Sequence, residues 1–254
     1  MYDVFVDDPK HLYITLELMR GGELFNGIQK KKMFNEQEAR DSCRVLLKAL
    51  KHIHSRDVAH RDLKPENILL ASESDCTRIK LADFGFACDV SDERPNDVCG
   101  TLGYMAPEIG RGRRYDTGVD MWSMGVITYI MLSGEKPFGS DFRQRHHFRQ
   151  NPNLTFETKY WSSVSEEAKD FIRKLLTVDP SKRLKASDAL KHCWLRRSGE
   201  ELVGNDLGSG LEQLLIFNVR RKLRAITRTY LAMKRMQERL GEGSSADEAD
   251  CDEA

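Results

Sequence analysis

The chain has 254 residues, of which 40% are hydrophobic and 31% charged, which suits one globular domain with appendages. Its 40 basic and 40 acidic residues cancel, so no charge of the whole chain favours a nucleic acid or a membrane surface as partner. The six cysteines form no Cys-x-x-Cys pair, which argues against a zinc site or a disulfide framework. With no secretory signal pattern and no membrane-spanning run, we expect a cytoplasmic or nuclear protein.

The first predicted elements are a hairpin and a helix. Residues 4–6 and 12–18 read as short strands on either side of a polar turn. Between residues 35 and 56 the apolar side chains fall on one helical face, and Asn35 with Glu38 forms the pattern of a helix-capping box. This helix should lead straight into the segment that follows it.

The middle of the chain is predicted to hold two short strands, residues 68–70 and 79–81. Paired strands would fix the polar side chains at their ends, Asn67 and Asp83. Beyond residue 108 the pattern is helical, and we expect three further helices. They cover residues 119–132, 165–176 and 187–194.

A last long helix is predicted over residues 211–240, and it is strongly basic. From residue 218 to residue 240 it has only one acid, Glu238, against eight cations. These are Arg220, Arg221, Lys222, Arg224, Arg228, Lys234, Arg235 and Arg239. Residues 241–254 reverse the sign, with six acids among Gly, Ser and Ala, so we expect an acidic disordered tail.

Three motifs in chain order point to phosphoryl transfer. That reaction needs a carboxylate to accept a hydroxyl proton, oxygen ligands for Mg²⁺, and a cation for the developing charge. Asp62 and Lys64 are two residues apart and can face the same phosphate, while neutral Asn67 beside charged Asp83 limits repulsion around metal ions. The motifs are His60-Arg61-Asp62-Leu63-Lys64-Pro65-Glu66-Asn67, Asp83-Phe84-Gly85 and Ala106-Pro107-Glu108.

In these motifs the chain resembles the eukaryotic protein kinases, over roughly residues 1–195. The resemblance implies that Asp62 is the catalytic base, that Lys64 steadies the transferring phosphate, and that Asn67 and Asp83 hold the metal ions. Lys64 after Leu63 is the serine/threonine-type signature. The implied cofactors are ATP and Mg²⁺. The implied fold class is α+β, with a mainly α-helical large lobe and a β-hairpin remnant of the small lobe.

The same resemblance assigns a nucleotide site. Leu16 would be the gatekeeper beside the adenine, and Glu17 to Met19 the hinge that binds it. Leu69 would form the floor under the base, and Glu23 would contact the ribose or the substrate.

Further residues of the resemblance bear on substrates and on structure. Glu23 and Glu66 would favour protein substrates with a basic residue upstream of the phosphorylated serine or threonine. Glu108 would pair with Arg183, and Asp120 would brace the catalytic loop from a helix.

Residues 21–25, 99–101 and 187–194 most resemble the calcium/calmodulin-dependent protein kinase group. In the activation segment, which also holds Thr101, Asp97 stands where some members carry an activating threonine. A carboxylate has one negative charge where a phosphate has about 1.5 to 2, so it could pair with Arg61 without an upstream kinase. An exposed loop acid without any role is the alternative.

The basic helix has an apolar side that includes Phe217, Leu223, Ile226 and Tyr230. Basic amphipathic helices are the kind that calmodulin wraps. Residues 215–223 are also similar to the regulatory segment of calmodulin-dependent kinases, which occupies the substrate groove until calmodulin lifts it. A solvated helix packed on the large lobe and a membrane-surface helix are the alternatives.

The glycine-rich loop, the ATP-binding lysine and the helix glutamate of the family are not found in the sequence. We therefore interpret the chain as N-terminally truncated, in preference to an evolved minimal kinase. Losing one charge-stabilising donor costs about 10² to 10³ in rate, so these 254 residues should be inactive or weakly active alone. The alternative function is a catalytically dead scaffold or decoy that binds calmodulin.

The expected function is a calcium/calmodulin-regulated serine/threonine protein kinase whose partners are protein substrates and calmodulin, with no nucleic acid and no membrane. The expected organisation begins with a small-lobe remnant hairpin at residues 1–17 and continues with the hinge and large lobe at residues 18–195. A regulatory segment at residues 196–240, containing the helix 211–240, and the acidic tail 241–254 complete it.

Overall fold

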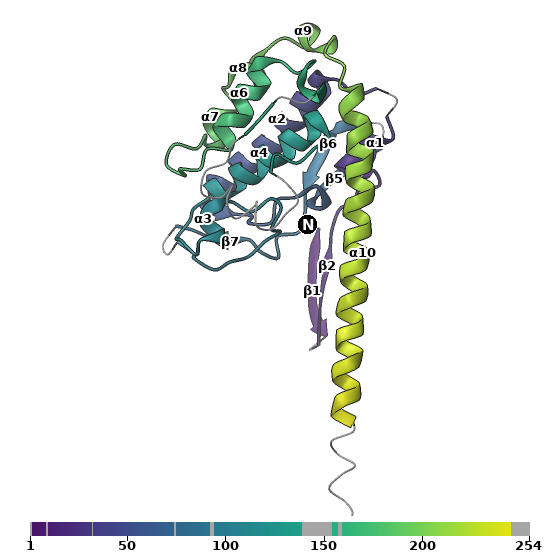
Figure 1. Ribbon diagram of the computed structural model, residues 1–254. Coiled ribbons are helices and arrows are strands. Elements are labelled where there is room, and N and C mark those ends of the chain that lie inside the picture. Colours follow the sequence, from purple (N-terminus) through teal and green to yellow (C-terminus); the bar gives the residue numbers. More distant parts are fainter. Residues whose placement is uncertain are drawn as a thin grey trace, which may run out of the picture. The chain divides into compact units, whose positions relative to one another are not determined.

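The computed structural model describes residues 2–8, 10–31, 33–73, 75–91, 94–138, 154–156 and 159–244. Contacts divide the chain into two units, Met1–Leu214 and Leu215–Ala254. The first unit combines helices with small sheets, which confirms the expected α+β class (Figure 1). Its helices are α1 (Leu24–Gln29), α2 (Glu36–His54), α3 (Pro107–Gly110), α4 (Gly118–Ser133), α6 (Glu166–Leu175), α7 (Ala186–Ala189), α8 (Cys193–Arg196) and α9 (Gly199–Val203); α10 (Gly208–Ser244) begins in this unit and continues into the second.

Helices α2 and α4 form the centre of the first unit and contact each other. The predicted capping box at the start of α2 is confirmed: Glu38 N donates to Asn35 Oδ1 at 3.0 Å, and Asn35 N donates to Glu38 Oε2 at 3.3 Å. All residues of α4 from Val119 to Ser133 are buried. A helix that is apolar all round is a core helix, so α4 is the rigid element on which the site can be built.

The described strands form small antiparallel sheets. In one sheet β5 (Ile68–Ser72) lies between β3 (Gly22–Glu23) and β6 (Asp75–Leu81), and in another β4 (Val58–Ala59) pairs with β7 (Cys88–Asp89). Leu69 is opposite Lys80, so the predicted pairing of residues 68–70 with 79–81 is confirmed. This pairing brings the ends of the two strands together.

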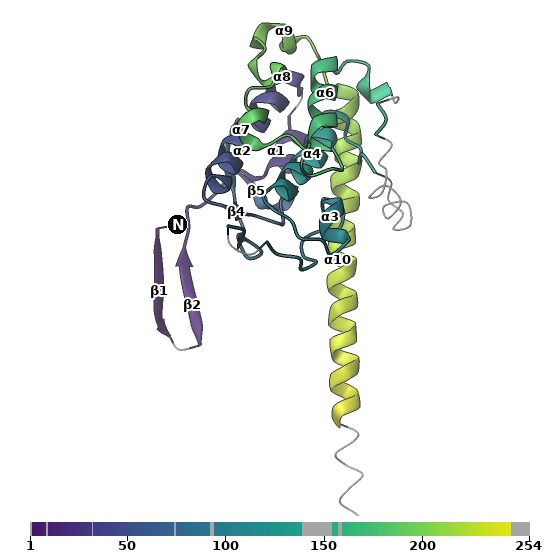
Figure 2. The same cartoon turned by 90° about the vertical axis from the view of Figure 1, so that its left-hand side faces the viewer.

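The predicted hairpin is present as β1 (Asp3–Asp8) and β2 (His11–Thr15), with Val4 opposite Ile14. In both views it extends beyond the helices of the first unit (Figure 1, Figure 2). All of β2 is exposed, and residues 16–18, predicted as its continuation, are not in a strand. A hairpin without further strands is marginally stable in water, so this element has little support of its own within the first unit.

The predicted helix over residues 187–194 is interrupted and forms α7 and α8 instead. His192 takes an extended conformation between them, with φ −59° and ψ 143°, and its Nδ1 accepts a hydrogen bond from Trp194 N at 3.3 Å. A side chain that caps a new helix competes with continuation of the old one. The break therefore follows from a local hydrogen bond that the apolar pattern does not reveal.

A buried carboxylate joins the segment after α9 to the rest of the first unit. Glu36 is fully buried and accepts hydrogen bonds from Ser165 N at 2.9 Å, Trp194 Nε1 at 2.7 Å and Asn205 Nδ2 at 2.8 Å, as well as from the Ser165 hydroxyl. A buried charge is tolerated only when it is well hydrogen-bonded. Residues beyond α9 are thereby tied to the start of α2.

Helix α10 is longer than predicted. It begins at Gly208 and ends at Ser244, where residues 211–240 were expected, so the first part of the expected tail is helical. The remaining tail residues, 245–254, lie outside the described residues. Among the described helices, none combines the length and the apolar character that crossing a membrane requires.

Candidate active site

The loop of residues 60–67 is hydrogen-bonded to Asp120 of α4, which is fully buried. Asp120 Oδ2 accepts from His60 N and Oδ1 from Arg61 N, both at 2.9 Å, and His54 Nε2 lies 2.9 Å from Oδ2. Arg61 has φ +67°, a conformation that costs free energy for a residue with a side chain. The buried carboxylate therefore stabilises a loop shape that the backbone alone would not choose.

Asp62, Lys64 and Thr101 form a compact polar group at the surface of this loop. Thr101 Oγ1 donates to Asp62 Oδ1 at 2.7 Å, and Lys64 Nζ donates to Asp62 Oδ2 at 2.5 Å. Asp62 is only 3% exposed, and Lys64 Nζ also lies 3.4 Å from Thr101 Oγ1. A carboxylate, an ammonium group and a hydroxyl thus share one small volume, as phosphoryl transfer requires.

The two residues expected to hold metal ions are brought together by the pairing of β5 with β6. Asn67 ends the short 3-10 helix η1 (Pro65–Asn67), Asp83 follows β6, and Ala82 N donates to Asn67 O at 2.8 Å. Asn67 Nδ2 donates to Asp62 O at 2.9 Å, and Asp83 Oδ1 accepts from Gly85 N at 3.2 Å. With respect to the part of the chain that the structure describes, Asn67 therefore has its amide oxygen available, and Asp83 its second carboxylate oxygen.

This donor set fits Mg²⁺. The described residues include no group of three or more His, Cys, Asp or Glu side chains that could hold a metal ion. Mg²⁺ in phosphate-transfer sites takes only one or two protein ligands and completes its shell with phosphate oxygens and water. One amide and one carboxylate oxygen are consistent with that arrangement.

The residues expected around the adenine are only partly brought together. In the three-stranded sheet Glu23 lies opposite Leu69, which lies opposite Lys80. Glu17 forms an ion pair with Lys80, which the sequence did not suggest. Leu16 is 62% exposed at the end of the hairpin. Glu23, Leu69 and Lys80 thus form a row across this sheet, and Glu17 contacts that row at Lys80.

Met19 and Glu66 are both half-buried. Glu66 lies in η1 directly beside Asn67. Its position places a carboxylate close to the catalytic loop, on the short element that also carries a metal-ligand candidate.

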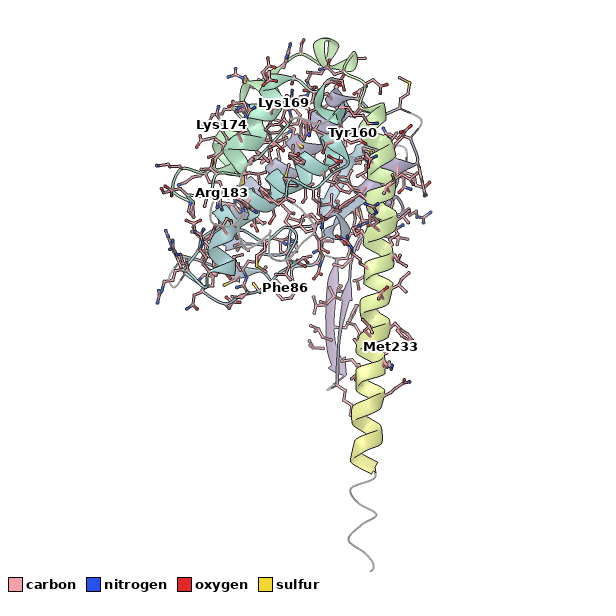
Figure 3. The ribbon with its side chains drawn as sticks, viewed as in Figure 1. Phe86, Tyr160, Lys169, Lys174, Arg183 and Met233 are labelled. Atoms are coloured by element: carbon pink, nitrogen blue, oxygen red, sulfur yellow. The ribbon has the colours of Figure 1, made fainter. Side chains whose placement is uncertain are left out.

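Arg61 ties three segments together. Its Nη1 donates to Asp97 Oδ1 at 2.7 Å, to Asp97 Oδ2 at 2.9 Å and to Tyr115 Oη at 2.9 Å, and its Nε donates to Phe86 O at 2.5 Å. Phe86 follows the Asp-Phe-Gly motif, and Figure 3 marks it. Tyr115 has no local sequence signal that could have predicted this contact.

The surroundings shift the pKa of both Asp97 and Tyr115. Partial desolvation raises the pKa of the Asp97 carboxyl, but the hydrogen bond from Tyr115 and the charge of Arg61 outweigh it and hold the pKa below the usual range. Burial raises the pKa of the Tyr115 hydroxyl, which stays protonated. Asp97 is therefore an ionised partner of Arg61, and the contact favours a role over a purely exposed loop acid.

Glu108 and Arg183 form a buried bidentate ion pair. Arg183 Nη1 donates to Glu108 Oε1 at 2.6 Å, and Nη2 donates to Oε2 at 2.9 Å. The guanidinium also donates to Gly118 O at 2.8 Å, and its centre lies 5.3 Å from the ring of Trp122. This pair joins the end of the activation segment to α4 and the chain after α6.

On α10 the residues expected to bind calmodulin do not all share one face. Leu223, Ile226 and Tyr230 are 62%, 66% and 65% exposed and are spaced three and four residues apart. Phe217 is half-buried, and at 100° per residue it lies about 180° around the helix from Ile226. The exposed apolar face therefore excludes Phe217.

Comparison with known proteins identifies the family of the chain. The protein kinase domain model matches residues 1–195. Calcium/calmodulin-dependent protein kinase type IV of Mus musculus and of Homo sapiens are each 40% identical over 243 residues, covering 94% of this chain and 50% of the relative. Myosin light chain kinase A of Dictyostelium discoideum is 43% identical over 192 residues, covering 75% of this chain and 65% of the relative.

The chain thus spans about half the length of the type IV kinases that it matches. Its matched region contains the catalytic loop, the Asp-Phe-Gly segment and the buried Glu108–Arg183 pair. The chain belongs to the protein kinase family.

Proposed function

We propose that this chain carries the phosphate-transfer lobe of a protein kinase that phosphorylates serine and threonine hydroxyls of proteins, with Mg²⁺ and ATP. The observation that supports this most strongly is the contact between Asp62, Lys64 and Thr101. The Thr101 hydroxyl already lies 2.7 Å from Asp62 Oδ1. A substrate hydroxyl that replaced it there would be within reach of a general base.

The chain's own residues divide the work of the reaction. Asp62 would orient the attacking hydroxyl and accept its proton, and the Lys64 ammonium would stabilise charge on the transferring group. Asn67 and Asp83 would hold Mg²⁺ through the oxygens that the chain leaves available. Bound Mg²⁺ and ATP would supply the phosphoryl group and neutralise charge on its oxygens.

The substrates would be proteins with a basic residue upstream of the phosphorylated hydroxyl. Glu23 and Glu66 lie on the elements that flank β5, and both are half-buried. Carboxylates so placed favour an arginine or lysine through charge-assisted hydrogen bonds.

The test is a transfer assay on the 254-residue chain with a serine peptide that carries an upstream arginine. Asp62→Asn should lower the rate by at least about 10², because the base is lost. Asp188→Asn is the matched control, because Asp188 is an exposed residue of α7 whose side chain pairs with Lys191. Replacing the peptide's arginine by alanine should also slow transfer. Because the chain alone is expected to be weakly active at most, each rate is measured above the background without protein, and equal rates for the wild type and Asp62→Asn would contradict the proposal.

A catalytically dead scaffold is the second candidate. It is favoured by the hairpin, whose large apolar side chains are exposed, as a partner-binding surface would be; Tyr2, Val6 and Leu12 are 72%, 70% and 60% exposed. The assay separates the two functions, because a scaffold predicts no difference between Asp62→Asn and the wild type.

We also propose that calcium-loaded calmodulin binds α10 beyond Leu214. The support is a basic helix with exposed Leu223, Ile226 and Tyr230, together with the names of the type IV relatives. Titration of the whole chain with calmodulin should show binding that needs calcium and is weakened by Ile226→Glu. Binding that is absent at micromolar concentration, or indifferent to calcium, would remove this part of the proposal.

A further inference from the structure

Six exposed apolar residues of α10 alternate three and four positions apart. They are Ile216, Val219, Leu223, Ile226, Tyr230 and Met233, and each is between 40% and 66% exposed. An alternation of three and four averages 3.5 residues, the period of a coiled coil, where a surface helix packed on a globular core follows 3.6.

We call this row of alternating apolar residues the seam, and it extends far enough along α10 for a stable coiled coil. The next two positions in the series are Gln237 and Leu240, and neither glycine nor proline interrupts residues 211–240. At 1.5 Å per residue the series from 216 to 240 is about 37 Å long, which is roughly three and a half heptads. In heptad terms Ile216, Leu223 and Tyr230 take the a positions, and Val219, Ile226 and Met233 take the d positions.

The cations of α10 mostly avoid this seam. By heptad position only Arg220, Lys222 and Lys234 border it, at e, g and e. The other five of the eight cations take the outward positions b, c and f; these are Arg221, Arg224, Arg228, Arg235 and Arg239. Cations at the outward positions make no direct contact across a pairing of two helices through a and d.

Two threonines complete the borders of the seam and add no unpaired hydroxyl to it. Thr227 Oγ1 donates to Leu223 O at 2.9 Å, and Thr229 Oγ1 donates to Ala225 O at 3.1 Å. Because both hydroxyls are satisfied within their own helix, an approaching helix would not have to supply partners for them.

We propose that α10 pairs with the α10 of a second copy of this chain, as a parallel two-stranded coiled coil. The bordering charges decide the orientation. In a parallel pair each g residue faces the e residue five positions later on the other helix. Those contacts are Leu215 with Arg220, Lys222 with Thr227, and Thr229 with Lys234, so no two cations meet.

An antiparallel pair is less favourable. With Ile216 of one copy beside Leu240 of the other, Arg220 of each helix would face Lys234 of the second helix. Two such like-charge contacts repel. The pattern of charge therefore selects the parallel arrangement from the two that the apolar seam allows.

The pairing does not rest on the proposed function, since it needs neither calcium, nucleotide nor catalysis. It does use Leu223, Ile226 and Tyr230, which the calmodulin proposal also uses. Calmodulin and a second copy would therefore exclude each other on α10, and calcium-loaded calmodulin should convert the dimer to complexes that contain one copy each.

The test is the mass in solution of the 254-residue chain without calcium, measured by sedimentation from about 1 to 100 µM. We expect the mass to rise with concentration from 29.2 kDa to twice that value. Ile226→Glu should remain monomeric, whereas the matched control Ala225→Glu, one position away and off the seam, should still dimerise. A wild type that stays monomeric, or that forms larger assemblies, would overturn the proposal.

Orientation has its own variant, which does not disturb the apolar seam. Thr227→Glu places a carboxylate opposite Lys222 of the second copy in the parallel pair, and two such pairs should tighten the dimer about two- to fivefold. In the antiparallel pair the two residues 227 face each other, so the same substitution would weaken the dimer. A weaker dimer therefore overturns the parallel arrangement. Far-UV circular dichroism confirms that each variant is folded.

Discussion

Removing the carboxylate of Asp97 should loosen the activation segment. The Asp97→Ala variant loses two hydrogen bonds from Arg61, at 2.7 and 2.9 Å, and one from Tyr115 at 3.1 Å. Arg61 keeps its contacts with Tyr115 and Phe86, so its guanidinium is not left without partners. Arg61 therefore loses one of its three partners, and that partner, Asp97, is the charged one.

The magnitude follows from the exposure of the two side chains. Hydrogen bonds to charged groups contribute about 1.5 to 3 kcal/mol when buried, and exposed ion pairs about 0 to 1 kcal/mol. The Arg61 side chain is 11% exposed but that of Asp97 is 56% exposed, so water screens the pair from one side. We expect Asp97→Ala to lower the free energy of unfolding by about 1 kcal/mol, and Asp97→Asn by less.

The assay combines denaturant unfolding with hydrogen exchange of residues 94–101, where local loosening should exceed the global effect. Because the pKa of Asp97 is lowered in the folded chain, its stabilisation is present above the unfolded value of about 3.9 and is lost as the pH falls through the folded pKa. The difference between Asp97→Ala and the wild type should shrink there. Unchanged exchange of residues 94–101 in Asp97→Ala at neutral pH would refute the reasoning.

Three further substitutions test the supports of the site by denaturant unfolding. Arg183→Met leaves Glu108 buried without its bidentate partner and should cost about 3 to 5 kcal/mol; a loss below 1 kcal/mol would contradict this. Glu36→Ala removes the acceptor of four donors, and a loss of about 2 to 4 kcal/mol is expected. Gly134→Ala should destabilise by at least about 1 kcal/mol, because Gly134 has φ +72° and a Cβ there would meet Gly210 O at 2.3 Å. An unchanged midpoint of unfolding would contradict this, because it would show that the backbone at Gly210 moves away from the added Cβ at no cost.

The parts of the fold that the sequence predicted are those encoded locally. The capping box at Asn35 and Glu38 needs only residues three positions apart, and it is present as expected. The pairing of residues 68–70 with 79–81 depends on a short polar turn between two apolar runs. Local patterns of this kind specify an element without knowledge of the rest of the chain.

Contacts between distant segments could not be predicted in the same way. Tyr115 reaches Arg61 across 54 positions, and Lys80 reaches Glu17 across 63. Neither Tyr115 nor Lys80 differs in type or spacing from an ordinary surface residue, so only the folded chain reveals these two contacts. The break between α7 and α8 was also missed, because the apolar pattern does not report the hydrogen bond that His192 makes.

The most direct test of the phosphate-transfer site is the effect of Mg²⁺ on ATP binding, since this does not depend on turnover. Isothermal titration of the whole chain should show that Mg²⁺ tightens ATP binding by about tenfold or more, and that Asp83→Asn abolishes this effect. The control substitution Asp188→Asn, at an exposed acid, should leave the effect of Mg²⁺ on ATP binding unchanged. An equal effect of Mg²⁺ in Asp83→Asn and in the wild type would contradict the account.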